Sequence, residues 1–367
     1  MKFRMFFASA ILLLGITSCI KDEALNMEAD IIDMTVVSDA FITRAITENT
    51  IQLVITEAAD YSNITPIIEV SPGATVQPES GVAQDFSNGK QVKYRVTSQD
   101  GKYVKEYTVS IIPKTTLKHT FEDWTTSGVG KAAHPILSDL LWSNANSGIG
   151  VLVLLGLKID QFPTDKTTDC VEGNYGVALQ TIKGTTVGAS NYPIFAGSLF
   201  RGKFTANMSN PLKSLKLGQA HTIENGKPIL FNGYYKYKPG DVFTGSNGEV
   251  IPNRTDSMSM YATLFKVTKG ASADAEYLDG ETILTSDRVV ATAKWALDAK
   301  DMVETPAING FTRFSIPFKY KEDLNFAAND YRLTIVFSSS KDGNEYQGAV
   351  GSKLIVDNVE IICDKIK

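Results

Sequence analysis

The last segment of the chain places the tightest limit on how it can fold. Residues 337–363 read FSSSKDGNEYQGAVGSKLIVDNVEIIC: an apolar strand, a loop rich in Gly and Ser, and a second strand that contains Asp357 and Asn358. A closing strand needs a partner strand to satisfy its backbone hydrogen-bonding groups. The best partner in the sequence is Thr120–Trp124 (TFEDW), far upstream. If these two segments pair, everything between them forms one closed β-domain.

The residues between these segments carry strand patterns almost throughout. Ser257–Leu264 (SMSMYATL) alternates polar and apolar residues, as a half-buried strand requires. Gly150–Leu157 (GVLVLLGL) is too short to cross a bilayer and is interpreted as a buried strand, and no amphipathic helix of useful length stands out. We predict a jelly-roll β-sandwich over residues 117–367. Its clearest strands are Gly176–Ile182, Ser198–Thr205, Leu230–Tyr237, Ser257–Val267, Ile283–Ala293, Phe311–Phe318 and Tyr331–Ser338.

A smaller domain precedes this sandwich. Alternation in Val92–Val96 and Tyr107–Ile111 indicates strands, and the pairs Asn88-Gly89 and Asp100-Gly101 indicate turns. The sequence therefore predicts an all-β protein with an Ig-like sandwich over residues 31–113, joined by residues 113–117 to the larger domain. The strands expected in the Ig-like domain are Ile31–Val37, Ile51–Thr56, Ile64–Val70, Gln91–Ser98 and Lys105–Ile112.

The first residues have the pattern of an export signal. Lys2 and Arg4 precede an apolar run, Phe6–Ile16, and residues 16–19 (ITSC) end in a cysteine after small residues. This pattern predicts a signal peptide over residues 1–18, lipidation at Cys19 and a tether over residues 19–30. The alternative is a plain secretory signal with a chance cysteine.

Residues 20–23 (IKDE) place a lysine and two acidic residues directly after Cys19. This resembles the lipoprotein export signal of Bacteroidetes and implies a protein anchored by lipid to the outer membrane, facing the cell exterior. A solvated linker with incidental charges is the alternative.

Composition and motifs exclude several classes of function. With Lys+Arg 36 and Asp+Glu 41, the net charge is −5, which argues against nucleic acid as a partner. His119, His134 and His221 lack zinc-site spacing, and no nucleophile elbow, P-loop or dinucleotide fingerprint is present. We therefore predict a protein that is not an enzyme. A glycoside hydrolase needs only two carboxylates and stays open as a less favoured alternative.

The aromatic residues suggest contact with sugar rings, which stack on flat side chains while amides bind hydroxyl groups. Alternation puts Tyr235 and Tyr237 on one face of a strand and Tyr234 on the other. Core packing is the alternative for all of these rings, and for Trp295 it is the favoured one. The candidates for glycan contact are Trp124, Trp142, Asn144, Asn146, Tyr234, Tyr235 and Tyr237.

Glu122, Asp123 and Asp357 form a second candidate site. The expected pairing of first and last strands brings these carboxylates to one sheet edge, with Asp256 and Asp342 as further members. Clustered carboxylates suit a hard cation, so a structural calcium ion is a hypothesis. The favoured alternative is that Asp357 accepts hydrogen bonds from backbone amides.

Two cysteines remain in the expected mature chain, Cys170 and Cys363. In an exported protein they can pair, and they can equally be two separate thiols. Both alternatives stay open.

The order of several short segments resembles the putative carbohydrate metabolism domain family of Bacteroidetes lipoproteins, over most of residues 119–363. The segments are TFEDW, WSNANSG, YGVALQT, GSLFRGKF, ILFNGYYKYKPGD, TDSMSMYATLF, FTRFSIPF and SSSKDGNEYQGAVGSKLIVDNVEI. The run from SPGATVQPESG to YTVSI resembles the Ig-like spacer modules near the N-terminus of such lipoproteins. GVLVLLGL departs from the polar connection expected after WSNANSG.

The resemblance implies a β-sandwich like those of carbohydrate-binding modules and a role with glycans. Combined with the residue patterns, it predicts a cell-surface lipoprotein that binds an oligo- or polysaccharide through its C-terminal sandwich. Its other expected partners are the outer membrane, through the lipid anchor, and other surface proteins of glycan uptake. The alternative is a structural or adhesive surface protein that binds other proteins.

Overall fold

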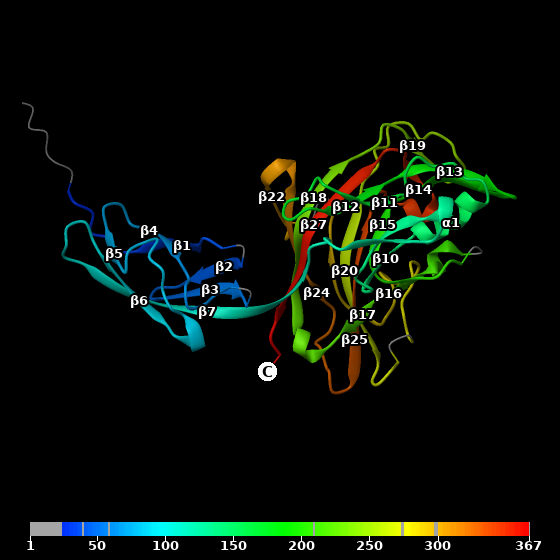
Figure 1. Ribbon diagram of the computed structural model, residues 1–367. Helices are drawn as coiled ribbons and strands as arrows, with labels where there is room; N and C mark the ends of the chain where they lie inside the picture. The colour runs from blue at the N-terminus through cyan, green and yellow to red at the C-terminus, as the bar shows by residue number, and fades with distance from the viewer. Residues whose placement is uncertain are drawn as a thin grey trace, which may run out of the picture. The chain divides into compact units, whose positions relative to one another are not determined.

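The computed structural model describes residues 24–38, 40–57, 59–207, 210–272, 275–296 and 300–366. The predicted signal peptide and Cys19 lie outside the described residues. Within them the protein is almost entirely β, with a single α-helix (Figure 1), so the predicted fold class is confirmed. None of the described helices is both long and apolar enough to cross a membrane.

The chain forms two compact units that meet in the sequence between Ile112 and Pro113. The strand β7 (Val104–His119) runs through this boundary without interruption. Residues 113–117, expected to be a linker, are therefore strand. The first half of β7 belongs to the first unit and its second half to the second unit.

The first unit pairs β1 with β4 and arranges the other strands in the order β5, β6, β7, β3, β2. Tyr94 and Val96 of β6 and Tyr107 and Val109 of β7 are buried, as their alternation predicts. β2 and β5 were not predicted, because their side chains are mostly exposed and show no apolar face. The strands are β1 (Ile31–Val36), β2 (Phe41–Ile46), β3 (Thr50–Thr56), β4 (Pro66–Val70), β5 (Thr75–Gln77) and β6 (Val92–Thr97).

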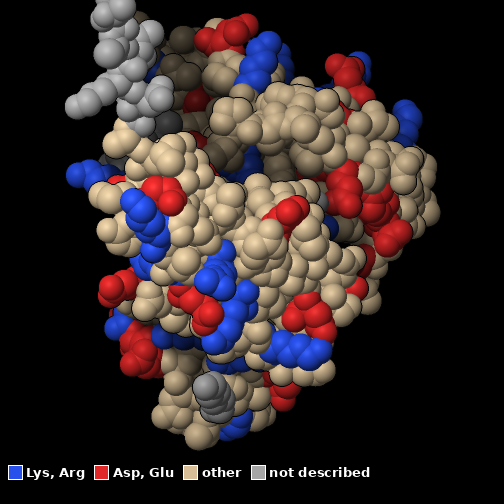
Figure 2. Space-filling model, turned by 90° about the vertical axis from the view of Figure 1, so that its left-hand side faces the viewer, with Lys and Arg blue, Asp and Glu red and all other residues tan. Residues whose placement is uncertain are grey.

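Charged side chains of opposite sign lie beside one another over the face shown in Figure 2. In the first unit, Lys93 contacts Glu106 at 2.7 Å and Arg44 contacts Asp33 at 2.6 Å, and all four side chains are partly exposed. Exposed pairs of this kind contribute little stability.

The second unit contains two packed sheets and several small hairpins. Its elements are β8 (Trp124–Ser127), β9 (His134–Leu137), β10 (Trp142–Asn144), α1 (Asn146–Leu154), β11 (Thr164–Thr167), β12 (Gly176–Gln180), β13 (Ile182–Val187), β14 (Ser190–Phe195), β15 (Ser198–Phe204), β16 (Leu215–Leu217), β17 (Gln219–His221), β18 (Lys227–Lys238), β19 (Phe243–Thr244), β20 (Ser259–Thr268), β21 (Val289–Lys294), β22 (Val303–Pro306), β23 (Thr312–Pro317), β24 (Lys319–Tyr320), β25 (Asn329–Ser338), β26 (Gly348–Ala349) and β27 (Lys353–Asp364).

The sheet that contains β27 is called the closing sheet. Its order in this unit is β7, β27, β18, β23, β22, with β12 also beside β27 and β11 beside β12. The facing sheet is called the groove sheet, with the order β10, β15, β25, β20, β21, β24. The two sheets pack face to face around one apolar core, which includes Phe231, Phe314, Leu333, Phe337, Val356 and Ile361, all fully buried.

The closing strand β27 has neighbours on both sides (Figure 1). β18 pairs along one edge, and the other edge pairs first with β12 and then with β7, where Ile361 lies opposite Leu117. The predicted partner, Thr120–Trp124, is wrong; the partner is Thr115–His119. Phe121 has a φ of 58° and turns the chain, so that Trp124 begins the β8–β9 hairpin instead.

Gly150–Leu157, predicted to be a buried strand, is also wrong: its first half lies in the helix α1. The helix ends where Gly156 adopts a φ of 106°, a conformation that glycine tolerates and that commonly terminates helices. A short apolar run does not by itself distinguish a strand from a buried helix. Only one side of α1 is covered, because Ile149 and Leu152 are buried while Leu154 and Leu155 are 67% and 68% exposed.

Both cysteines of the described chain are free thiols. Cys363 points into the core from β27, whereas Cys170 lies in the loop between β11 and β12 and is partly exposed. The Cys363 side chain is packed in the core and forms no disulfide. Burial raises the pKa of its thiol to about 12.

Two histidines of the second unit are held in their neutral form by the fold. Trp142 Nε1 donates to His119 Nδ1 at 3.3 Å, and His221 Nε2 lies 2.8 Å from the carbonyl oxygen of Gly226. Burial, with the nearby charge of Arg201, lowers the pKa of His119 to about 3. Burial lowers the pKa of His221 to about 4 against the effect of the Gly226 hydrogen bond. The folded protein therefore binds fewer protons at these sites than the unfolded chain.

These pKa values predict acid sensitivity. A histidine in the unfolded chain titrates near 6.5, so the stability present above that pH is lost as the pH falls toward 4. For His221 the loss of unfolding free energy reaches about 3 kcal/mol. We expect His221→Gln to flatten the decline of the urea midpoint of the second unit between pH 7.5 and 4.5. If the urea midpoint fell equally with pH in the wild-type and variant proteins, His221 would not be a source of the acid sensitivity.

Candidate functional site

Trp142, a predicted glycan contact, lies in the core on β10 and is 5% exposed. Its indole packs edge-on against Phe121 at 5.3 Å and stacks on Phe337 at 6.4 Å. As placed, the ring has no open face for a sugar, and it fixes β10 against the closing sheet instead.

Asn144 and Asn146 are also buried, at 6% and 1% exposed. Both amide groups donate to the Pro135 carbonyl oxygen, and Asn146 also donates to that of Thr164 at 2.7 Å. These bonds hold β9, β11 and the start of α1 together. The two asparagines therefore serve the fold in this structure, and a role in glycan contact stays a prediction.

The remaining predicted aromatic contacts are half-buried. Trp124 Nε1 donates to the Phe121 carbonyl oxygen at 2.7 Å. Tyr235 and Tyr237 pack against the core from one face of β18, and the Tyr235 hydroxyl donates to Glu304 at 2.8 Å. Tyr234 lies on the outer face of the closing sheet, in register with Asp357 and Arg313. The structure therefore does not bring the three tyrosines into one site.

The carboxylate of Asp357 is fully buried and binds backbone amides, which was the favoured interpretation of this residue. It accepts from the N–H groups of Val171, Glu172 and Asn358 at 2.7, 3.3 and 2.8 Å. Burial raises the pKa of Asp357, while these three hydrogen bonds act in the opposite direction. Asp357 thus fixes the loop between β11 and β12 over the closing sheet.

Glu122 binds the same loop, accepting from the N–H groups of Asn174 and Tyr175. The side chain of Asp123 is exposed. Within residues 24–366, leaving out the gaps in the described chain, no three His, Cys, Asp or Glu side chains are grouped to hold a metal ion. A calcium site at Glu122, Asp123 and Asp357 stays a prediction.

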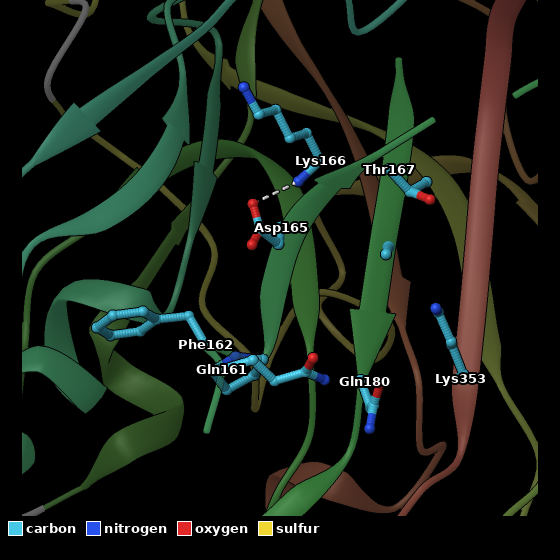
Figure 3. Close-up of a pocket in the computed structure, with 9 residues that line it drawn as sticks. Gln161, Phe162, Asp165, Lys166, Thr167, Gln180 and Lys353 are labelled. Atoms are coloured by element: carbon cyan, nitrogen blue, oxygen red, sulfur yellow. Dashed lines mark hydrogen bonds between the residues drawn. The ribbon is translucent and has the colours of Figure 1, made fainter. Parts of the chain in front are cut away.

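Among the hollows formed by the described residues of the second unit, one lies on the outer face of the closing sheet. It has a volume of about 110 Å³ and is lined by polar side chains of neighbouring strands, with Phe162 pointing away from them (Figure 3). Ligand sites usually enclose roughly 300–1,000 Å³, so this hollow is too small for an oligosaccharide. Its polar lining consists of Gln161, Asp165, Lys166, Thr167, Gln180 and Lys353.

The larger hollow is a groove of about 470 Å³ on the outer face of the groove sheet. Its walls are α1, the β13–β14 hairpin and the loop 341–346, together with the segments 204–207, 212–217 and 280–285. The helix and the hairpin lie at the same end of the unit in Figure 1. Tyr261 and Val336 form the apolar part of its floor, with Ser259 and Ser338 beside them. This volume lies within the range of ligand-binding sites.

Three aromatic rings line one end of this groove: Tyr192 and Phe195 of β14 and Tyr346 of the loop after β25. The rings of Tyr192 and Tyr346 are 4.8 Å apart, and Phe195 lies 5.9 Å from Tyr192 and 6.3 Å from Tyr346. All three are half-buried, so each keeps part of its surface open to the groove. We call these residues the aromatic trio.

Tyr346 is held in a strained conformation, with a φ of 58° that side-chain-bearing residues rarely adopt. Such strain persists only where the surroundings enforce it, and it concentrates at functional sites. The loop also runs close to its neighbours: a Cβ on Gly343 would come within 2.4 Å of the Ala196 side chain. The loop conformation is therefore fixed before any ligand binds.

The buried carboxylate of Asp256 organises this loop. Its Oδ2 accepts from the hydroxyl groups of Ser340 and Ser352 at 2.6 and 2.7 Å and from the N–H of Ala349 at 2.8 Å. Its Oδ1 accepts from the N–H of Ser257 at 2.8 Å. One side chain thus joins both ends of the Gly- and Ser-rich loop to the segment that precedes β20.

We expect Asp256→Ala to destabilise the second unit by about 3 kcal/mol or more, because it leaves buried donors without their acceptor. Amide hydrogen exchange should rise across residues 340–352. Glu249→Ala, which removes a carboxylate from an exposed turn, is the control. Unchanged exchange in that loop of the Asp256→Ala protein would show that Asp256 does not organise it.

Comparisons with known proteins identify the family of this chain. Residues 120–362 match the family described as putative carbohydrate metabolism domain, and residues 32–111 match the family described as SGBP, N-terminal. The first match covers more than half of the chain, so the protein belongs to the putative carbohydrate metabolism domain family, which confirms the family predicted from the sequence. No curated protein matches the chain.

Two solved structures are similar to this protein, one over most of its length and one over about two thirds of it. One is a putative glycoside hydrolase from Bacteroides thetaiotaomicron, 32% identical, with a TM-score of 0.53, covering 94% of this chain and 99% of that one. The other is a putative glycoside hydrolase from Bacteroides vulgatus, 30% identical, with a TM-score of 0.54, covering 67% of this chain and 97% of that one.

Proposed function

We propose that this protein binds glycan at the cell surface through the groove of its second unit. The observation that carries the proposal is the aromatic trio, because a preformed groove with open aromatic faces suits the apolar faces of sugar rings. Hydroxyl groups of the sugar would bond to the polar side chains along the floor and rim, among them Ser259, Ser338 and Asn344. The family of the second unit, named for carbohydrate metabolism, supports this proposal.

The first unit supports a location at the surface. Its family is named for SGBP, a surface glycan-binding protein, at the N-terminus. We propose that it separates the glycan-binding unit from the membrane, and that Cys19 carries the lipid that anchors the chain in the outer membrane. Several acyl chains would hold the protein firmly, whereas a single one gives only marginal binding.

The binding proposal is tested by screening the protein on a glycan array and measuring each hit by calorimetry. We expect Tyr346→Ala to weaken the binding of a hit about ten- to thirtyfold, because truncating a central aromatic contact costs about 1.4–2 kcal/mol. Tyr103→Ala is the matched control, since Tyr103 is an exposed tyrosine of the first unit. Equal affinities of the two variants would place the glycan outside the groove.

The anchor is tested separately. Cys19→Ala should remove lipid labelling of cells fed a fatty-acid analogue and move the protein from the detergent phase to the aqueous phase. The same partitioning before and after substitution would show that Cys19 does not carry the anchor.

Glycoside hydrolysis is the second candidate, favoured by the names of the two similar structures. The groove is lined by two carboxylates, Glu281 and Asp342. Glu281 accepts from Asn210 at 2.7 Å and Asp342 from Arg254 at 2.5 Å. Hydrolysis would appear as new reducing ends when a bound oligosaccharide is incubated with the protein and would vanish in Glu281→Gln and Asp342→Asn. A bound oligosaccharide recovered intact would favour binding alone.

A further inference from the structure

The charged side chains that line the groove differ in whether another side chain of the protein already binds them. Four charged side chains line it: Glu281, Asp342, Lys294 and Lys341. Each of the two carboxylates already has a cationic or amide donor. The Arg254 guanidinium that binds Asp342 is itself held over the Phe243 ring at 4.0 Å, so this pair is fixed in place.

The two lysines differ from the carboxylates. Both are exposed, and no carboxylate of the described residues lies within 4.0 Å of the Lys294 or the Lys341 ammonium group. Two lysines of β20 and the loop after it are paired instead: Lys266 contacts Glu322 at 2.7 Å, and Lys269 contacts Asp330 at 2.7 Å. An amide donor does not neutralise the Glu281 carboxylate, so the described lining sets two lysine charges against one carboxylate charge and is positive on balance.

The positions of these lysines suit a ligand that lies along the floor. Lys294 is opposite Tyr261 in the register of β20 and β21. The backbone of Lys341 binds the carbonyl oxygen of Ser257, four residues before Tyr261, at 2.7 Å. At about 3.3 Å per residue, the backbone points of the two lysines are separated by roughly 13 Å along the strand direction, on opposite sides of β20 and at either end of the Ser259–Tyr261 floor. A ligand bound along this floor therefore runs past both Lys294 and Lys341.

We propose that the groove selects acidic glycans, in which a carboxylate or a sulfate group of the sugar bonds to Lys294 and Lys341. This inference rests on the proposed glycan-binding function and narrows its ligand class. A partly enclosed groove strengthens such charge-assisted contacts relative to open water, and added salt weakens them. The aromatic trio contacts the face of the sugar ring, and the lysines give the groove its preference for sugars that carry a carboxylate or a sulfate group.

The test uses the whole mature chain and three matched oligosaccharides: one neutral, one with uronic acid residues and one with sulfate esters. We expect an acidic oligosaccharide to bind more tightly than the neutral one and to lose affinity as salt is raised. The double variant Lys294→Gln, Lys341→Gln should weaken that acidic ligand about tenfold and abolish most of the salt effect. Lys321→Gln, an exposed lysine that does not line the groove, should change neither.

The outcomes separate this inference from the function on which it rests. If the uronate alone or the sulfate alone shows the expected effect, that anion is the ligand group. If the neutral oligosaccharide binds as tightly as both acidic ones and Tyr346→Ala weakens it, the groove binds glycan but the acidic preference is wrong. If the double variant binds an acidic ligand as the wild type does, the assignment of the lysines is wrong. If no oligosaccharide binds, both proposals fall.

Discussion

The hydrogen-bonded ladder on both edges of β27 is the interaction on which the second unit depends. β18 continues one edge, and β12 and β7 share the other, so the last strand joins the beginning, the middle and the end of this unit. Its inward side chains, among them Val356, Val359 and Ile361, are fully buried. Because the strand is central, its backbone groups are satisfied and neither edge is left open for another chain.

The groove lies on the outer face of the groove sheet, and both faces of this sheet carry apolar side chains. Met260, Ala262 and Leu264 of β20 face the core between the sheets, while Tyr261 and Phe265 face a second apolar cluster on the outside. The Asp256 network fixes the loop after β25 beside this cluster, and α1 and the β13–β14 hairpin rise around it. The proposed binding surface is thus a part of the outer face that other elements do not cover, with small side chains at Ser259 and Ser338.

Much of the fold was predictable, because alternation along a strand reports directly which face is buried. The strands around Tyr94, Tyr107 and Phe314 follow from that pattern alone. Other features did not follow. The polar start of Ser257–Leu264 suggested a half-buried strand, although β20 is buried on both faces from Met260 to Phe265. The short apolar run that enters α1 carried no periodicity.

The candidate site was less predictable than the fold. Trp142 was predicted as a sugar contact but lies in the core, whereas Tyr235 and Tyr237 share one face of β18, apart from Tyr234, as the alternation predicts. Tyr192, Phe195 and Tyr346 are distant in sequence and meet only through the fold. One signal was present: Tyr346 lies between Gly343 and Gly348, in the loop that the closing strand holds in place.

The central claim, that the groove rather than the opposite sheet binds glycan, is tested most directly by a crystal structure of the protein with a bound oligosaccharide. The account predicts sugar density between α1 and the aromatic trio, with its rings against Tyr346 and its polar groups along the Ser259–Tyr261 floor. Density on the outer face of the closing sheet, around Tyr234, would contradict it.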